Sequence, residues 1–135
     1  MSEQPLPKDV QRFIADHISS VVVLEALLML FARPGRGWSA GQLGAELRVD
    51  PVWTERELAE LARRGVIRRG EGARAGEPAL YEYPEDAPTR ATLAGLAECY
   101  QERRVSVISL IFAKPAEAIQ TFADAFNLRK DRHGR

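Results

Sequence analysis

The sequence predicts a mainly α-helical fold with one small β-hairpin and a helical arm toward its C-terminal end. Helix start and stop signals punctuate residues 39–65, and two strand-like runs around a glycine-rich segment follow them directly. A long stripe of apolar residues at helical spacing then occupies residues 89–113. The chain has 135 residues, of which 45% are hydrophobic, so it is long enough for one hydrophobic core and is not typical of a disordered protein.

The first part of the chain is expected to be helical. Loose tails are expected at residues 1–7, which contain two prolines, and at residues 131–135. The first domain is expected to cover residues 8–84. A short amphipathic helix opens this domain, and Ser19 or Ser20 caps a second, strongly apolar helix. Because apolar residues lie nearly all round the second helix, we expect it to be the central buried helix. The apolar side of the first helix is formed by Val10, Phe13 and Ile14.

The middle of the chain carries the signals of two consecutive helices joined by a tight turn. Ser39, with Gln42 three residues later, forms a capping-box pattern at the start of the first of them. Asp50 caps the second helix, and Pro51 occupies its first position, where a missing N–H costs no hydrogen bond. Gly65 is a typical helix terminator. The residues expected to be buried are Leu43 and Leu47 in the first helix and Thr54, Leu58 and Leu61 in the second.

Two short strands are predicted after this helix pair. Val66–Arg69 and Ala79–Tyr83 are rich in strand-forming residues and flank a hairpin tip at Gly70–Glu77. The order helix, turn, helix and hairpin, which covers roughly half the chain, resembles the winged-helix superfamily. That resemblance implies a winged helix-turn-helix fold, and it matches Trp38 to the short strand that precedes the helix pair. In bacterial regulators, the usual function of this superfamily is to bind DNA.

A helical arm is expected over residues 85–130. Its first helix covers residues 89–113, and a last helix covers residues 116–128. The β-branched run at residues 105–112 is also compatible with a strand, and we favour a helix because the apolar stripe continues through it without a turn signal. The whole arrangement of elements, including the Phe122–Phe126 run, also resembles small uncharacterised winged-helix proteins of proteobacteria, a resemblance that implies no particular activity.

The apolar stripe of the arm predicts a homodimer. A stripe of this length is too long to be buried entirely against a domain of about 70 residues, and paired helices from two subunits are the simplest way to cover it. The alternative is an arm that folds back across its own domain in a monomer. The candidate dimerisation residues are Leu93, Leu96, Tyr100, Val107, Ile108, Ile111, Phe122 and Phe126.

The winged-helix resemblance also indicates which residues would contact double-stranded DNA. The second helix of the pair would enter the major groove, and the hairpin, or wing, would contact the phosphate backbone. The function predicted on this basis is that of a DNA-binding transcriptional regulator. The candidate groove residues are Trp53, Thr54 and Arg56, and the candidate wing residues are Arg68, Arg69 and Arg74.

The charge balance supports a different function. The chain has 19 basic and 19 acidic residues and no net charge, whereas DNA-binding proteins are usually basic because they neutralise phosphates. Glu55, Glu57 and Glu60 also lie on the helix that would enter the groove. The alternative function is that of a winged-helix module that binds a protein partner through a surface centred on Trp53. The simplest explanation of the three glutamates is that they lie on a helix face exposed to solvent.

Nothing in the sequence indicates an enzyme, a metal site or a cofactor. His17 and His133 have no catalytic or metal-ligand spacing, and Cys99 is expected to be a small apolar side chain in the arm. The chain has no signal peptide pattern and no apolar run long enough to span a bilayer, so we expect a cytoplasmic protein without a membrane partner.

A third interpretation is a ligand-responsive switch with a pocket between arm and domain, for which the available aromatic residues are Trp38, Tyr81 and Tyr100.

Overall fold

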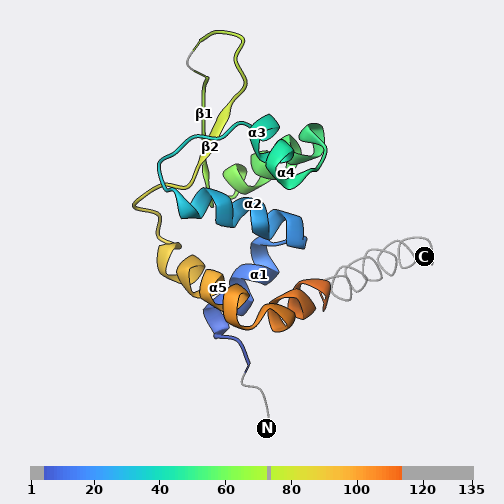
Figure 1. The fold of residues 1–135 in the computed structure, drawn as a ribbon. Helices are drawn as coiled ribbons and strands as arrows, with labels where there is room; N and C mark the ends of the chain where they lie inside the picture. The colour runs from blue at the N-terminus through green and yellow to red at the C-terminus, as the bar shows by residue number, and fades with distance from the viewer. Residues whose placement is uncertain (1–4, 73, 114–135) are drawn as a thin grey trace, which may run out of the picture.

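Figure 1 shows a computed structural model of the chain, which describes residues 5–72 and 74–113. The helix α2 lies in the middle of the molecule, with the hairpin extending away on one side and α1 and α5 on the other. The fold is therefore mainly α-helical with one hairpin, as the sequence predicts. In chain order the elements are α1 (Lys8–His17), α2 (Val21–Ala32), α3 (Ala40–Leu47), α4 (Pro51–Arg63), β1 (Arg68–Gly70), β2 (Leu80–Glu82), α5 (Arg90–Glu102) and a further helix, Arg104–Ala113.

The helix starts lie where the capping residues predict them. Ser39 and Gln42 form both hydrogen bonds of the capping box at the start of α3, with lengths of 3.1 and 2.9 Å. Asp50 accepts a 2.8 Å hydrogen bond from a backbone N–H in the first turn of α4, and Pro51 occupies the first position of that helix. Ser20 is the residue that caps α2. These bonds satisfy backbone donors that a helix start otherwise leaves without partners.

The wing is a two-stranded antiparallel hairpin that is anchored to the rest of the fold at its base. Arg68 pairs with Glu82 and Gly70 pairs with Leu80, so both strands are shorter than the sequence predicts. Trp38 forms an isolated bridge with Tyr81, and the two backbone hydrogen bonds between them measure 2.8 and 2.7 Å. This bridge confirms the short strand expected at Trp38.

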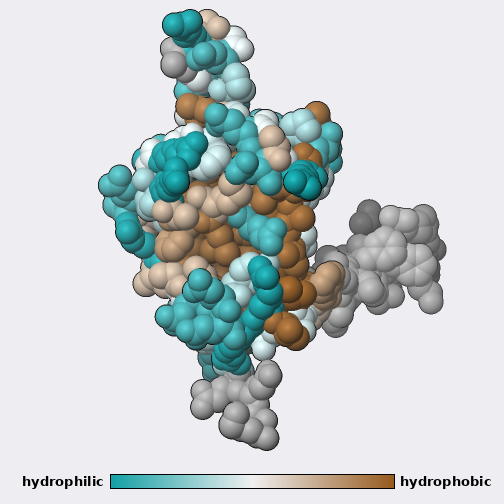
Figure 2. Space-filling model, in the orientation of Figure 1, coloured by the Kyte–Doolittle hydropathy of each residue, from teal (hydrophilic) through white to brown (hydrophobic). Residues whose placement is uncertain are grey.

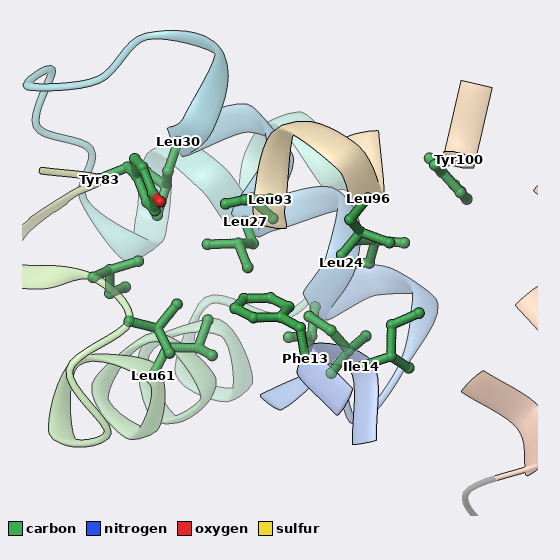
Figure 3. Packing of buried hydrophobic residues seen from close by; sticks show 14 of the residues in the cluster. Phe13, Ile14, Leu24, Leu27, Leu30, Leu61, Tyr83, Leu93, Leu96 and Tyr100 are labelled. Carbon is green, nitrogen blue, oxygen red and sulfur yellow. The ribbon is translucent and has the colours of Figure 1, made fainter. Parts of the chain in front are cut away.

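One hydrophobic core holds the helices and the base of the wing together. Figure 3 shows its centre, where side chains of α1, α2, α4, α5 and the end of the wing meet. The helix α2 contributes most to this core, as expected for a helix with apolar residues nearly all round it, and its buried residues are Val23, Leu24, Ala26, Leu27 and Leu30. Tyr81 and Tyr83 bring the second wing strand into the same core, because both are fully buried.

The helix predicted over residues 89–113 is interrupted, and this corrects the expectation of a single straight arm. Arg103 adopts φ −133° and ψ 53°, which ends α5, and a new helix begins at Arg104. Residues 105–112 are helical, which resolves the choice between helix and strand in favour of the helix. The interruption changes the direction of the chain between the two helices (Figure 1).

Most of the apolar stripe of the arm is buried in the protein's own core. Ile108 is half-buried, while Phe122, Phe126 and the helix expected over residues 116–128 lie outside the described residues. Leu6, which was expected in a loose tail, is also buried. The arm therefore packs back against its own domain, as in the monomeric alternative. The stripe residues that are buried in this way are Leu93, Leu96, Tyr100, Val107 and Ile111.

In the part of the chain that the structure describes, no single helix is long and apolar enough to cross a membrane. The helices α1 and α2 reach the necessary length and composition only when taken together, and they meet at an angle of 112°.

Candidate functional site

The outward stripe of α4 consists of apolar, small and basic side chains, and Glu60 lies at its edge. Thr54, Leu58 and Leu61 are buried, which fixes the side of this helix that faces the core. The opposite side, at helical spacings of three and four residues, carries one apolar and two basic side chains around a small alanine. The residues on this outer stripe are Val52, Arg56, Ala59 and Arg63.

The three glutamates of α4 lie beside this outer stripe, and each contacts another part of the protein. Glu55 accepts a hydrogen bond from the Tyr81 hydroxyl, and Glu57 accepts one of 3.3 Å from the Ser19 hydroxyl. The third glutamate, Glu60, is held by two arginines, as described below. Hydrogen bonds from neutral hydroxyls hold Glu55 and Glu57 in place but leave their negative charges, and Glu60 pairs with Arg63 of the outer stripe.

Glu60 forms ion pairs with both arginines at the end of α4. Arg63 lies 2.6 Å and Arg64 2.7 Å from the same carboxylate oxygen. Their hydrogen bonds, that from Arg63 above all, lower the pKa of Glu60 from 4.5 to about 2. Glu60 is therefore a carboxylate at any physiological pH, and the three residues together carry one net positive charge at the C-terminal end of α4, where the helix dipole favours it.

Two of the three predicted groove residues are accessible, and the third is not. Arg56 is exposed, and within the described residues it has no hydrogen bond or ion pair. Trp53 is half-buried beside it. Thr54 is only 2% exposed, and its hydroxyl donates a 2.8 Å hydrogen bond to the Asp50 carbonyl. The assignment of Thr54 to the groove is wrong, because the helical period that buries Leu58 also turns Thr54 toward the core.

The three predicted wing arginines are all exposed, but their side chains differ in their hydrogen-bond and ion-pair partners. Arg68 forms a cross-strand ion pair with Glu82, and the Nε of Arg69 donates a 3.2 Å hydrogen bond to the Tyr81 hydroxyl. The side chain of Arg74 at the hairpin tip has no partner among the described residues. Figure 2 shows that hydrophilic residues dominate the outer part of the wing. Arg74 is thus the wing arginine with the most freedom to contact another molecule.

A buried tyrosine joins α4 to the wing. Tyr81 has no exposed surface, and its hydroxyl lies between Glu55 of α4 and Arg69 of β1. Burial, together with the Glu55 carboxylate, raises the pKa of Tyr81 above its ordinary value of 10.0. The hydroxyl therefore remains a donor to Glu55 at neutral pH, and it holds the wing at a fixed position relative to α4. The sequence gives no signal for this link, because the three residues lie far apart along the chain.

Two exposed arginines outside α4 and the wing were not identified from the sequence. Arg33 follows α2 directly, and Arg36 stacks on the Trp38 ring with its guanidinium carbon 3.8 Å from the ring centre. Both line an open groove between α2 and α3. The Arg36-Gly37-Trp38 sequence was the only available signal, and a pair of one basic and one aromatic residue at that spacing is too common to indicate a site.

The aromatic residues suggested for a ligand pocket do not share one. Trp38 lines the groove between α2 and α3, and Tyr100 lines a different groove with Leu28 of α2. Tyr81 is part of the core. Among the described residues, no group of three or more histidine, cysteine or acidic side chains is placed to hold a metal ion. Cys99 is a free thiol, half-buried against the core.

The chain was compared with known proteins at three levels. No protein-family model matches it, and no curated protein matches it. Solved structures do match, and they include a MarR family transcription regulator with TM-score 0.54, which is 21% identical over 91% of this chain and 76% of its own. The MepR–DNA complex of S. aureus matches with TM-score 0.51 and 13% identity, over 92% of this chain and 89% of its own.

A third solved structure has a similar fold. A possible transcriptional regulator from Methanosarcina mazei matches with TM-score 0.50 and 14% identity, over 76% of this chain and 85% of its own. At these identities, the likeness establishes the fold. The chain has a winged helix-turn-helix fold of the type found in MarR family regulators, in which α3 and α4 form the helix-turn-helix and β1 and β2 the wing.

Proposed function

We propose that this protein is a DNA-binding transcriptional regulator that places α4 in the major groove of double-stranded DNA. The observation that carries this proposal is the outer stripe of α4, where Arg56 is exposed and its side chain has no partner among the described residues. An arginine in this position suits a bidentate contact with guanine. Arg74 at the tip of the wing would contact the phosphate backbone.

The solved structures that share this fold support the same function. They include a MarR family transcription regulator and MepR in complex with DNA. Such a function needs no catalytic centre, and we place it in the cytoplasm. The neutral net charge predicts modest affinity for unrelated DNA, because few phosphates would be neutralised.

We further propose that the protein acts as a homodimer, although not through the stripe residues that its own core buries. The helix Arg104–Ala113 exposes two large apolar side chains on one face, Val105 at 77% and Phe112 at 67%. Large exposed apolar side chains on one helix face favour an interface with another protein surface. A twofold symmetric dimer would present two copies of α4 to successive turns of the duplex.

One observation favours a winged-helix module that binds a protein partner instead. Val52 is 67% exposed and lies next to the half-buried Trp53 at the start of α4. Aromatic and apolar residues in such a position are common at protein interfaces. Apolar side chains also contact thymine methyl groups in the major groove. A binding experiment is therefore needed to distinguish DNA binding from protein binding.

Fluorescence anisotropy of labelled duplex DNA tests the proposal directly. The full-length protein is titrated into the DNA upstream of its own gene and into a random fragment of equal length, at low and at near-physiological salt. We expect binding to the upstream DNA to persist at near-physiological salt and binding to the random fragment to disappear. The slope of log K against log salt should be shallow, because only a few ion pairs form. No binding to either duplex at low salt would overturn the proposal in favour of the protein-binding module.

A further inference from the structure

Few side chains of α4 are exposed. The exposed residues of this helix are Pro51, Val52, Arg56 and Arg63. Pro51 is the first residue of the helix, and Arg63 at the other end forms an ion pair with Glu60. Val52 and Arg56 are therefore the two side chains of α4 that are best placed to contact the edges of bases in a major groove.

Val52 and Arg56 lie on the same side of the helix, one turn apart. Residues four positions apart in an α-helix project one above the other, and here they are separated by about 6 Å along the helix axis. Successive base pairs of a duplex are about 3.4 Å apart. The two side chains therefore reach base pairs that lie within about two steps of each other.

Val52 is suited to the one apolar group that base edges present in the major groove. Its side chain is 67% exposed and has no hydrogen-bonding atom. The C5 methyl group of thymine is the apolar group on these edges, and contact between the two removes apolar surface of both from water. Val52 therefore distinguishes a pyrimidine that carries a C5 methyl group from one that does not.

Arg56 is suited to guanine. A guanidinium group has only donors, and guanine presents two acceptors, O6 and N7, on its major-groove edge. Adenine is usually read by asparagine or glutamine, and the sequence of α4 contains neither. The hydroxyl of Thr54 is buried and bonded to the Asp50 carbonyl, so it does not reach a base.

The glutamates of α4 increase the share of the affinity that base contacts supply. Glu55, Glu57 and Glu60 remain negatively charged beside the outer stripe and repel phosphate groups. Contacts with phosphates supply most of the affinity that does not depend on sequence. Since that part is small here, a change in a single base contact should be easy to measure.

We propose that α4 recognises a pyrimidine C5 methyl group through Val52 and a guanine through Arg56, at base pairs within about two steps of each other. The inference rests on the proposed DNA-binding function and adds the bases that are read. Because Val52 makes no hydrogen bond, 5-methylcytosine fits this position as thymine does.

The test begins with duplexes that the full-length protein selects from a random pool. The selected duplexes should share a thymine and a guanine at the proposed spacing. Uracil in place of that thymine removes only the methyl group and should weaken binding about three- to fivefold. In place of the guanine, 7-deazaguanine lacks the N7 acceptor and should weaken binding about fivefold or more.

Substitutions in α4 assign each base contact to its side chain. Val52→Ala should bind the thymine and uracil duplexes with equal affinity, whereas Val52→Ile, the matched control, keeps the apolar contact and should still prefer thymine. Arg56→Met should bind the guanine and 7-deazaguanine duplexes equally and should still prefer thymine to uracil. Both positions are exposed, so these substitutions should not disturb the core.

A methylated cytosine separates the methyl group from the rest of the base pair. The selected T·A pair is replaced by a C·G pair, with and without a methyl group at C5 of the cytosine. The methylated duplex should bind about three- to fivefold more tightly, because the two duplexes differ only in this apolar group. The difference should disappear in Val52→Ala.

Two results would overturn the inference and leave the proposed function intact. One is equal affinity for the thymine and uracil duplexes at every selected thymine. The other is a preference for thymine in Val52→Ala that is as strong as in the unchanged protein. In both cases the protein still binds DNA. A protein that selects no duplex from the pool would overturn the proposed function itself, and this inference with it.

Discussion

At the scale of single residues, Tyr81 links the most parts of the molecule. Its backbone pairs with Trp38, its ring is fully buried, and its hydroxyl contacts Glu55 and Arg69. One side chain thereby fixes the base of the wing, the outer part of β1 and the first half of α4 relative to one another. A buried hydroxyl with two polar partners stabilises a single arrangement, because any displacement leaves a partner without its hydrogen bond.

Tyr81→Phe is predicted to loosen this arrangement without unfolding the protein. Loss of the hydroxyl should lower the free energy of unfolding by about 1 kcal/mol, because Glu55 and Arg69 can regain water as a partner. The affinity for DNA should fall as well, since the wing is no longer held against α4. Urea unfolding and DNA-binding titrations measure the two effects. Unchanged DNA affinity would contradict a positioning role for the hydroxyl.

Tyr81 also predicts a pH dependence at alkaline pH. Burial and Glu55 raise the pKa of Tyr81 in the folded protein, so the unfolded chain loses this proton first. The stabilisation is therefore complete below about pH 10 and is lost as the pH rises through the higher pKa of the folded state. Urea unfolding between about pH 8 and 11 should show a steeper loss of stability in the protein than in Tyr81→Phe. Parallel curves would contradict the raised pKa.

At the scale of elements, α3 and α4 cross at very close range. A Cβ atom on Gly44 would lie 3.0 Å from the Val49 carbonyl oxygen and 3.3 Å from Thr54 Oγ1. The packing between these helices therefore leaves little room for a side chain at this position. Gly41, on the same helix, has no atom closer than 3.8 Å, so the two glycines form a matched pair.

Alanine at these two glycines is predicted to have opposite effects. Gly44→Ala should destabilise the protein by about 1 kcal/mol, because the crowding outweighs the better helix propensity of alanine. Gly41→Ala should stabilise it by about 0.5–1 kcal/mol through helix propensity alone. Thermal unfolding of both variants checks this pair. A stabilised Gly44→Ala would show that α3 and α4 are not in the close contact described.

The wing is predicted to be dispensable for folding and necessary for full DNA affinity. Only residues near its base, such as Tyr81 and Tyr83, reach the core. Replacing residues 71–79 with an Asn-Gly turn should leave the melting temperature within a few degrees and weaken DNA binding through the loss of Arg74. Calorimetry and anisotropy on the shortened protein test both parts. A shortened protein that binds DNA as tightly as before would exclude the wing from the interface.

The elements also show how far the sequence determines this fold. The starts of α3 and α4 follow from local chemistry, because Ser39 and Asp50 bond to the backbone within their own first turns. The interruption at Arg103 does not, since no glycine or proline marks it. It arises from tertiary packing: α5 packs on α1, and the next helix lines a groove with Leu6 and Gln11. For the same reason the sequence could place Arg56 on the exposed side of α4 but could not find the contact of Tyr81 with Glu55.

At the scale of the whole molecule, the arm closes the core of its own domain and leaves a different apolar face exposed. Val105 and Phe112 lie on that face, on a helix whose opposite side buries Val107 and Ile111. The proposed dimer therefore uses residues that the expected stripe did not include. The number of subunits determines whether one or two copies of α4 contact the DNA.

Phe112→Glu is predicted to produce a monomer. Light scattering coupled to gel filtration should give twice the 15.0 kDa chain mass for the protein and the single mass for this variant. Val52→Glu is the matched control, because Val52 has the same exposure of 67% and lies on α4, away from the proposed interface. A protein that elutes as a monomer at micromolar concentration, or a Phe112→Glu variant that stays dimeric, would contradict this interface.

The central claim is that the outer stripe of α4 contacts DNA, and the most direct measurement is the affinity of Arg56→Met for duplex DNA beside that of Arg12→Met. Both variants remove one exposed arginine that has no partner among the described residues, so that both change the net charge equally. The account predicts that Arg56→Met weakens binding to the preferred duplex by about tenfold or more, whereas Arg12→Met has little effect. Equal affinities for the two variants would contradict the placement of α4 in the groove.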